Sequence, residues 1–351
     1  MRSKKNYILS AVLKKIRKPL VLTKLKFPEL KKNQLLIKIL YSGLCRSQIM
    51  EIDGKRGKDK WLPHLLGHEG VGEVMKIGDN VKKFRIKDKV IMTWIKCKGK
   101  SSENPEYFSY NNQKINSGKI TTFSNYTVTS EDRLVKKPNS MALNIAPFFG
   151  CAIQTGGGIV LNQINPKKRD FVAIIGLGGV GLSALMTLKA LNIKNVICID
   201  INSSRLKIAN KYGFRNLINL KKDNLLKKIN KFSNNQGIDY CIESAGTSKT
   251  IELGMSLIKN NGKLIFASHP DYKNKICLNP HDLILGKKII GSWGGKCNPD
   301  KDIIKIYNLF KKKKINFNFF KNKIYDFNKI NKALKDFKTG KAIRPIIKMY
   351  H

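Results

Sequence analysis

The chain has 351 residues, which is more than one compact core usually holds and suits two domains. Its hydrophobic fraction of 42 % is normal for a globular protein, and no apolar run approaches the roughly 18 residues of a membrane-spanning helix. The formal net charge of +44 would suit nucleic-acid or anionic-membrane binding, but the lysines are spread along the chain without an RNA-binding or zinc-finger signature. We interpret the charge as compositional drift toward Lys, Asn and Ile, and expect no specific nucleic-acid partner and no membrane.

The seven cysteines and the N-terminal stretch bear on the compartment. The cysteines are scattered and none belongs to a Cys-x-x-Cys pair, so a disulfide framework is not expected. The basic N-terminal stretch contains only ILSAVL as an apolar segment, which is too short for the core of a signal peptide. We therefore expect a cytoplasmic protein.

Residues 1 to about 150 are predicted to be rich in β-strands. The segments LLIKILYSG, GVGEVMKIG and DKVIMTWI cluster β-forming residues between Gly, Asp and Asn turns. The stretch 96–119 is polar and rich in turn residues, so we expect a long surface loop there.

From about residue 170 the chain alternates strands and helices. DFVAIIGLGG is a continuous apolar run that is typical of a buried parallel strand, and VGLSALMTLKAL then has a helical pattern. NVICIDI and SSRLKIANKYG repeat the pair, and further strands are expected at GIDYCIESAG, GKLIFASHP and KKIIGSWGG. This alternation predicts a doubly wound parallel sheet, followed from about residue 293 by mixed helix and strand.

The turn between the first of these strands and its helix fits the pattern G-x-G-x-x-G, formed by Gly176, Gly178 and Gly181 with Gly179 and Val180 between them. Such a turn brings backbone N–H groups and a helix N-terminus to a pyrophosphate. Asp200 ends the next strand, where it can accept hydrogen bonds from both ribose hydroxyls of NAD and would repel the extra phosphate of NADP. The positive charge of Arg205 would favour the extra phosphate of NADP and so oppose this preference, but Arg205 lies beyond the strand end. The sequence therefore favours an NAD site over a chance glycine-rich turn.

Candidate metal ligands occur in three separate segments. Cys45 lies in GLCRS, His68 in GHEG and Cys151 in FFGCAIQTGGG. Two Cys and one His can bind zinc while leaving the fourth position open for a substrate, as a catalytic site requires. Their separation along the chain is not diagnostic, and for each residue alone a structural role is the more frequent alternative.

The segments that flank these residues carry a family resemblance. GLCRS, LLGHEGVGEV, TFSNYTV, GCAIQTG, GLGGVGL, CIDIN and GKAIRPI stand in the order and at the spacings of the zinc-containing medium-chain alcohol dehydrogenases. The chain resembles that family over about residues 7–350. The resemblance implies an α/β fold in which a GroES-like, β-rich catalytic domain (1–152 and 293–351) surrounds a Rossmann NAD-binding domain (153–292).

The resemblance also implies a role for individual residues. Cys45, His68 and Cys151 match the ligands of one catalytic zinc, and Glu69 matches a carboxylate that can approach the metal from behind. Ser47 matches the hydroxyl that takes the proton of the alcohol before hydride passes to the nicotinamide ring. The other matched positions are Arg46 and Arg344 at the pyrophosphate, Thr155 and Val180 beside the nicotinamide, and Trp94 in the substrate pocket.

Three positions depart from the pattern of the family. The loop that often holds four cysteines around a structural zinc keeps only Cys97, so no structural zinc is expected. Gln48 stands where an Asp usually orients the His ligand; it can still accept a hydrogen bond but adds no negative charge. Met50 replaces the proton-relay His of some members, so the proton must leave by another path, such as a cofactor ribose hydroxyl and water.

Other readings stay open at this point. A polyol dehydrogenase or a dehydrogenase of a glutathione adduct would share the same ligands, and an alcohol panel with NAD separates them. A zinc-free quinone-type NAD(P)H reductase would lack the metal, and a basic nucleic-acid-binding protein would show salt-sensitive DNA binding without NADH formation. The family forms homodimers or homotetramers, partly through the strand that corresponds to 288–292, and the sequence alone does not fix the number of subunits, the substrate or the physiological direction.

Overall fold

The computed structural model describes residues 6–317 and 323–351, and the chain divides into two compact units. The β-rich unit comprises Met1–Cys151, Asn298–Ile304 and Phe317–His351. The parallel-sheet unit comprises Ala152–Cys297 and Lys305–Asn316, so that helix α9 (Pro299–Lys312) contributes residues to both units. The functional domain bounds expected from the sequence stay a prediction.

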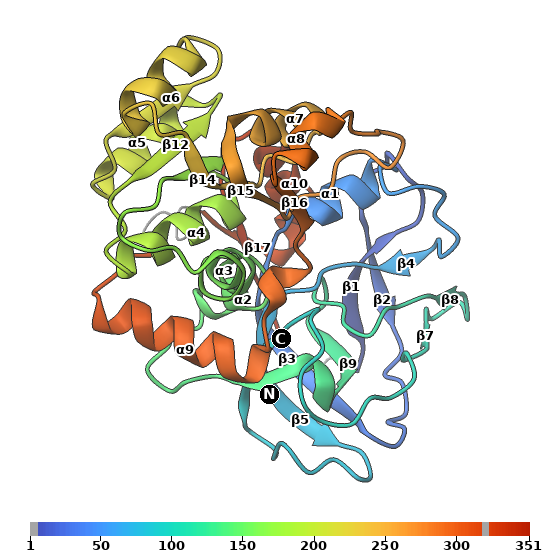
Figure 1. Ribbon diagram of the computed structural model, residues 1–351. Helices are drawn as coiled ribbons and strands as arrows, with labels where there is room; N and C mark the ends of the chain where they lie inside the picture. Colours follow the sequence, from blue (N-terminus) through green and yellow to red (C-terminus); the bar gives the residue numbers. More distant parts are fainter. Residues whose placement is uncertain (1–5, 318–322) are drawn as a thin grey trace. The chain divides into compact units, whose positions relative to one another are not determined.

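Three sheets build the β-rich unit (Figure 1). The seven-stranded sheet runs in the order β10 (Leu134–Lys136), β6 (Lys89–Met92), β5 (Gly70–Ile77), β3 (Gln34–Gly43), β18 (Ile346–Lys348), β17 (Ile324–Asp326), and β9 (Tyr126–Ser130) also pairs with β3. The three-stranded sheet has the order β2 (Val21–Leu25), β1 (Ile8–Leu13), β4 (His64–Leu65). The third is a hairpin of β7 (Tyr107–Phe108) and β8 (Lys114–Ile115), which lies within the stretch predicted to be loop throughout.

Few helices accompany these sheets. They are α1 (Arg46–Ile52), α2 (Ala146–Phe149) and α10 (Ile330–Lys338), with 3₁₀ turns η1 (Glu131–Arg133) and η4 (Phe327–Lys329).

The core of the β-rich unit forms around strand β3. Leu35, Ile37 and Ile39 alternate along this strand, so their side chains share one face, and all three are fully buried. They belong to one apolar cluster with Val74 of β5 and Val90 of β6. The packed face fixes the register of β3 and thereby the position of the residues that follow its end, where the candidate site begins.

The parallel-sheet unit contains one six-stranded sheet. Its order is β13 (Asn216–Asn219), β12 (Val196–Asp200), β11 (Val172–Ile175), β14 (Ile238–Glu243), β15 (Ile258–Phe266), β16 (Lys288–Gly291), and all adjacent strands are parallel. In chain order this is 3-2-1-4-5-6, the arrangement of dinucleotide-binding sheets. The helices are α3 (Ala152–Gly158), α4 (Gly179–Ala190), α5 (Ser203–Lys211), α6 (Leu225–Ser233), α7 (Ser248–Leu257) and α8 (Pro280–Ile284), with a π turn η2 (Ile159–Ile164) and a 3₁₀ turn η3 (Gly294–Lys296).

The central strand β11 is apolar throughout because helices cover both faces of a sheet of this kind. Its four residues are at most 1 % exposed. The predicted helix after β12 begins at Ser203, and Asn202 caps it by accepting a hydrogen bond from the Ser204 N–H. The carboxyl ends of β11 and β12 therefore place the glycine turn and Asp200 at the same edge of the sheet.

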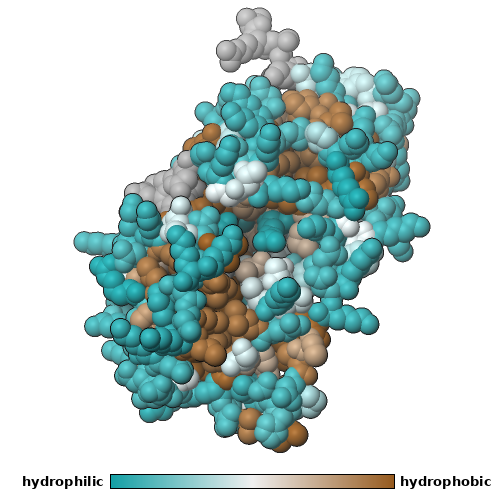
Figure 2. All heavy atoms as spheres, turned by 90° about the horizontal axis from the view of Figure 1, so that it is seen from above, coloured by the Kyte–Doolittle hydropathy of each residue, from teal (hydrophilic) through white to brown (hydrophobic). Residues whose placement is uncertain are grey.

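Many charged side chains face the solvent, whereas others, among them Glu69, Asp200 and Arg344, are buried. Hydrophilic side chains predominate on the face drawn in Figure 2, with smaller apolar areas between them. Over the residues that the structure describes, no helix has both the length and the apolar character needed to cross a bilayer.

Candidate metal centre and dinucleotide site

Cys45 reaches the candidate site at the junction of strand β3 and helix α1. It is the N-cap of α1 and has an extended backbone, with φ −111° and ψ 152°. The neighbouring backbone is anchored to the rest of the unit, since the Gly43 N–H donates to the Glu69 carbonyl at 3.0 Å. This places the end of β3 beside the segment that carries His68.

His68 and Glu69 lie immediately before strand β5. Gly67 has a φ of +90°, and a Cβ at this position would lie 2.4 Å from Thr122 Oγ1 and 2.8 Å from the Phe123 backbone nitrogen. Only glycine fits this left-handed turn and close approach. The turn sets the direction in which the following His68 side chain leaves the backbone.

The three predicted ligand residues converge in the β-rich unit. Cys151 follows helix α2, and its Sγ lies 3.9 Å from Cys45 Sγ and 3.3 Å from His68 Nε2. All three ligand atoms lie within 4.8 Å of one another. Tetrahedral zinc would hold its ligand atoms about 3.8 Å apart for two sulfurs and about 3.6 Å apart for sulfur and nitrogen. The observed donor set and spacing fit one zinc ion.

The thiols of Cys45 and Cys151 are hydrogen-bonded to one another, and this bond moves their pKa values in opposite directions. The hydrogen bond from Cys151 is the main reason that the pKa of Cys45 is well below its ordinary range, and the same bond raises the pKa of Cys151 well above it. Burial alone would lower the pKa of His68, but the neighbouring Cys45 raises it overall. Cys45 is therefore the more acidic thiol of the pair, and a divalent cation bound by both sulfurs would displace their protons.

Glu69 is completely buried beside the ligands and pairs with Arg344, which is 4 % exposed. Burial raises the pKa of Glu69 to about 7. The ion pair joins Arg344 Nη2 to Glu69 Oε1. The other carboxylate oxygen, Glu69 Oε2, and Arg344 Nε have no hydrogen-bond partner. The guanidinium also lies 5.4 Å from the centre of the Phe148 ring. Arg344, which the family resemblance assigns to the pyrophosphate, thus lies beside the thiols as the partner of a buried carboxylate, a contact that the sequence did not suggest.

Gln48 and Ser47 surround the ligands on helix α1. Gln48 is 1 % exposed; its Oε1 accepts the Cys45 N–H at 3.0 Å and its Nε2 contacts His68 Nδ1. The same Nε2 donates to Ser47 Oγ at 3.2 Å. The amide oxygen, which we expected at the His ligand, is therefore directed to the Cys45 backbone. Ser47 is half-buried next to Cys45 in the chain, and Arg46 is exposed.

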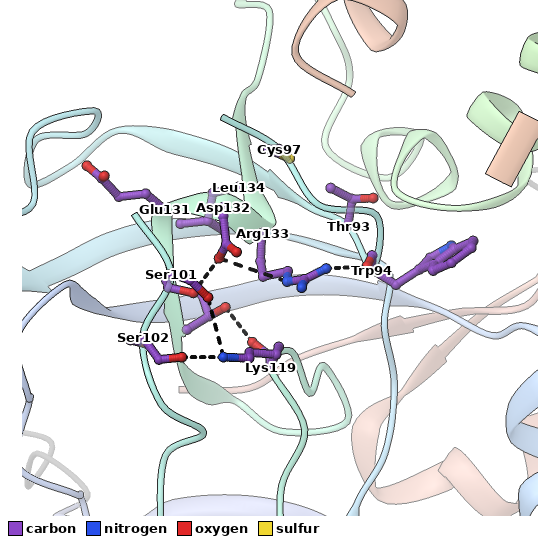
Figure 3. A network of polar contacts seen from close by, with 12 residues as sticks. Thr93, Trp94, Cys97, Ser101, Ser102, Lys119, Glu131, Asp132, Arg133 and Leu134 are labelled. Carbon is purple, nitrogen blue, oxygen red and sulfur yellow. Dashed lines mark hydrogen bonds and ion pairs between the residues drawn. The ribbon is translucent and has the colours of Figure 1, made fainter. Parts of the chain in front are cut away.

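Trp94 lies beside the metal ligands. Its ring meets the His68 ring edge-on, with 6.5 Å between the ring centres. Its carbonyl accepts a hydrogen bond from Arg133 Nη1 at 2.5 Å, and Figure 3 shows this bond and the contact of Arg133 with Asp132, both residues of the 3₁₀ turn η1. Arg133 therefore fixes the backbone of a residue that borders the candidate site, at the start of the loop that precedes β7.

Carboxylates hold this loop in place. Glu131, 3 % exposed, accepts the backbone N–H groups of Lys82, Lys83 and Lys100. Asp300 accepts Lys83 Nζ at 2.7 Å and the Lys98 N–H at 2.6 Å. Within 6–317 and 323–351, the one group of three or more His, Cys, Asp or Glu side chains close enough to share an ion is the Cys45, His68 and Cys151 cluster. The expectation that the chain binds no structural zinc stays a prediction.

The glycine turn forms between β11 and α4 as expected. Gly176 has a φ of +88°, and a Cβ there would lie 2.6 Å from the Ala245 nitrogen. Gly178 caps α4, which begins at Gly179, so Val180 and Gly181 lie in the first helical turn, where backbone N–H groups are free of helical partners. Thr155 is buried in α3 of the same unit.

Asp200 closes this turn from the end of β12. The side chain is 4 % exposed; its Oδ2 accepts the Leu177 N–H at 2.7 Å and its Oδ1 accepts the Asn202 N–H at 2.8 Å. Arg205 Nη1 lies 3.7 Å from Oδ2. The carboxylate therefore connects the glycine turn to the loop that begins α5.

Comparison with known proteins agrees with a metal centre in the β-rich unit and a dinucleotide site in the parallel-sheet unit. The model of the alcohol dehydrogenase GroES-like domain matches residues 31–139, and the model of the zinc-binding dehydrogenase matches residues 179–312. The chain belongs to the zinc-containing medium-chain alcohol dehydrogenase family. The family resemblance and the fold class, a GroES-like domain with a parallel Rossmann sheet, are therefore confirmed.

Relatives of this family match along nearly the entire chain. Alcohol dehydrogenase-like 1 of Arabidopsis thaliana is 28 % identical over 342 residues, covering 89 % of this chain and 88 % of the relative. Alcohol dehydrogenase 6 of Peromyscus maniculatus is 26 % identical, with 96 % of both chains covered. Among solved structures, benzyl alcohol dehydrogenase of Acinetobacter calcoaceticus has a TM-score of 0.87 at 26 % identity, with 98 % of this chain and 99 % of that chain covered. As a member of the family, the chain is a zinc-binding oxidoreductase of the alcohol dehydrogenase type.

Proposed function

We propose that this chain is an NAD-dependent alcohol dehydrogenase whose one catalytic zinc is held by Cys45, His68 and Cys151. The observation that carries the proposal is the convergence of these three ligand atoms within 4.8 Å, from three distant segments of the sequence. When bound, zinc supplies a Lewis acid for an alcohol or carbonyl oxygen. Two thiolates and one imidazole leave the fourth coordination position for the substrate.

Two residues beside the metal ligands have distinct roles in the proposed reaction. Ser47, whose hydroxyl is fixed by Gln48 Nε2 at 3.2 Å, takes the proton of the alcohol. Trp94 lines the pocket from beside His68, as its edge-on ring contact supports. Because an aromatic residue suits an aromatic substrate and one similar structure is a benzyl alcohol dehydrogenase, we include aryl alcohols among the candidate substrates. Polyols and glutathione adducts stay alternatives.

The cofactor assignment follows from the parallel-sheet unit. The N–H groups of the turn at Gly176, Gly178, Gly179 and Gly181 bind the pyrophosphate, and Arg46 and Arg344 are the predicted cationic partners. Asp200, with Arg205 beside it, favours the ribose hydroxyls of NAD over the phosphate of NADP. Val180 and Thr155 are the proposed contacts of the nicotinamide. In this proposal residues 153–292 bind the cofactor, and 1–152 with 293–351 carry the catalytic zinc.

We also propose a homodimer or a homotetramer. Strand β16 ends the six-stranded sheet, so one of its edges is unpaired within the described part of the chain. Exposed apolar side chains stand before and after this strand in the chain: Ile284, at the end of α8, is 78 % exposed, and Trp293 is 69 % exposed. An unpaired strand with exposed apolar side chains before and after it in the chain favours pairing with a second copy.

The proposal is tested on purified protein by metal analysis together with a screen of primary, secondary and aryl alcohols and aldehydes against NAD and NADP. We expect one zinc per chain, NADH formation with at least one alcohol, and loss of turnover in Cys45→Ser while NAD still binds. Full activity of metal-free protein, or of Cys45→Ser, would overturn the metal assignment. Salt-sensitive DNA binding without NADH formation would support the binding-protein alternative instead.

A further inference from the structure

The side chain of Gln48 lies between two hydrogen-bonding groups that belong to metal ligands. At one end of the amide, Oε1 accepts the Cys45 N–H at 3.0 Å; at the other end, Nε2 contacts His68 Nδ1. The side chain is 1 % exposed, so bulk water does not take the place of either contact. The amide therefore links the backbone of one predicted ligand to the ring of another.

Binding of a cation determines what His68 requires from this amide. Its Nε2 faces the sulfurs and lies 3.3 Å from Cys151 Sγ, so a cation at the centre binds Nε2. A neutral imidazole that binds a cation through Nε2 carries its hydrogen on Nδ1 and donates it. With the cation bound, the groups at the two ends of the Gln48 amide are therefore both donors, the Cys45 N–H and the His68 Nδ1–H.

A carboxamide cannot satisfy two donors at its opposite ends. It has an oxygen at one end and an NH₂ group at the other, so one donor faces NH₂ whichever way the amide of Gln48 is turned. A carboxylate has an acceptor oxygen at each end and satisfies both donors. The conflict is absent when the ring hydrogen is on Nε2, since His68 Nδ1 can then accept from Gln48 Nε2, the atom that it contacts.

We propose that Gln48 is a positioning residue whose amide leaves one donor unsatisfied when His68 binds a cation, so that the centre releases zinc more readily than the same centre with a carboxylate at position 48. The inference rests on the proposed function, since it assumes that Cys45, His68 and Cys151 hold the metal. Partners that orient metal-binding histidines typically change metal affinity about 10- to 100-fold. Occupancy of this centre consequently follows the concentration of free zinc.

The direct test is the zinc affinity of Gln48→Glu, measured by competition with a chromophoric chelator at fixed alkaline pH. Glu has nearly the shape of Gln and carries an acceptor at both ends of the group, so we expect about 10-fold tighter zinc binding or more. Glu51→Gln is the control for a change of charge alone. Glu51 lies on helix α1, as Gln48 does, and its carboxylate acts on His68 only through its charge. The substitution leaves the contacts of Gln48 unchanged. We expect less than about threefold change in affinity for this variant.

A second measurement reports the hydrogen bond directly. At the same alkaline pH, where the ring is neutral, the ¹⁵N chemical shifts of His68 in metal-free protein should place the ring hydrogen on Nε2 in the wild type and on Nδ1 in Gln48→Glu. If Gln48→Glu does not fold, as judged by its thermal melting, Gln48→Asp is measured in the same way. Equal zinc affinity of wild type and the carboxylate variant, with unchanged ring hydrogens, would overturn the inference while the proposed function stands. Failure of both proteins to bind zinc would instead overturn the proposed function and the inference with it.

Discussion

Arg344 forms an ion pair with Glu69 across 275 residues of sequence, and both side chains are almost completely shielded from solvent. The guanidinium also acts electrostatically on both thiols: it adds to the lowering of the Cys45 pKa that the Cys151 hydrogen bond causes, and it partly opposes the raising of the Cys151 pKa by the same bond. One cation thus compensates a buried carboxylate and lies close enough to act on two predicted ligands. The pair joins the segment before β5 to the segment before β18, so it stabilises the fold at the place where the metal is expected.

Removing only the charge of Arg344 should destabilise the protein more than removing the charges of both Arg344 and Glu69. Arg344→Met leaves the Glu69 carboxylate buried without a partner, which typically costs about 3–5 kcal/mol of unfolding free energy. The double variant Glu69→Gln with Arg344→Met removes both charges, and we expect it to recover a substantial part of that loss. Chemical denaturation of the wild type, both single variants and the double variant measures the coupling. Strictly additive single losses would show that the two side chains do not stabilise one another.

Zinc content should depend on Cys151 and not on Cys97. Cys97 is buried, its Sγ lies 3.6 Å from the Ile95 carbonyl, and burial raises its pKa to about 12, so it is a neutral thiol. We expect Cys97→Ser to retain one zinc per chain, whereas Cys151→Ser loses its zinc after dialysis against a weak chelator. Metal analysis by mass spectrometry and thermal melting of each variant make the comparison. Two zinc ions per wild-type chain, with one lost in Cys97→Ser, would contradict the prediction of a single site.

The sequence predicted the elements whose signals are local. The apolar run of β11, the glycines after it and Asp200 at the end of β12 lie within one strand–helix–strand unit, so their pattern determines their position. The convergence of Cys45, His68 and Cys151 was inferred through the family resemblance, because no local pattern connects segments so far apart.

Contacts between distant side chains could not be predicted in the same way. Nothing near Glu69 indicates that its partner is Arg344, since many arginines and lysines were available. The orientation of the Gln48 amide depends on competition between the Cys45 N–H and the His68 ring, which only the folded geometry decides. The β7–β8 hairpin was missed because two-residue strands are too short to show an alternating pattern.

Glu131 should make the stability of the β-rich unit sensitive to acid. Burial alone would raise the pKa of this carboxyl, but the N–H groups of Lys83, Lys100 and Lys82 lower it overall. A carboxyl with a lowered pKa in the folded state stabilises fully above its unfolded pKa of about 4.3, and this contribution is lost as the pH falls through the folded pKa.

Glu131→Gln is the variant that measures this contribution. Because hydrogen bonds to a charged acceptor contribute about 1.5–3 kcal/mol each, we expect a loss of about 2–3 kcal/mol of unfolding free energy at pH 7. The difference from the wild type should shrink as the pH falls from the unfolded pKa of about 4.3 through the lower folded pKa, where the wild-type carboxyl also becomes neutral. Urea unfolding at a series of pH values measures the loss of unfolding free energy at pH 7 and its decrease at lower pH. A difference that stays constant over this range would mean that the charge of Glu131 contributes nothing.

Asp200→Asn should weaken the preference for NAD by two separate routes. The amide has one acceptor oxygen, so it cannot accept both the Leu177 N–H and the Asn202 N–H as the carboxylate does, and the glycine turn becomes looser. It also replaces charged hydrogen bonds to the ribose hydroxyls by neutral ones, which are weaker by about a factor of two. We expect kcat/KM with NAD to fall about 10- to 100-fold, since a lost bond to a charged group corresponds to about 1.5–3 kcal/mol.

The activity with NADP should fall much less, because the repulsion between the Asp200 carboxylate and the ribose phosphate disappears. The matched control is Asp170→Asn, which changes a carboxylate of the same unit just before β11, at the opposite end of that strand from the glycine turn; its ratio of NAD to NADP activity should equal that of the wild type. Steady-state kinetics with both cofactors provide the ratio for each variant. If Asp200→Asn kept the wild-type ratio, the end of β12 would not be the element that distinguishes the two cofactors.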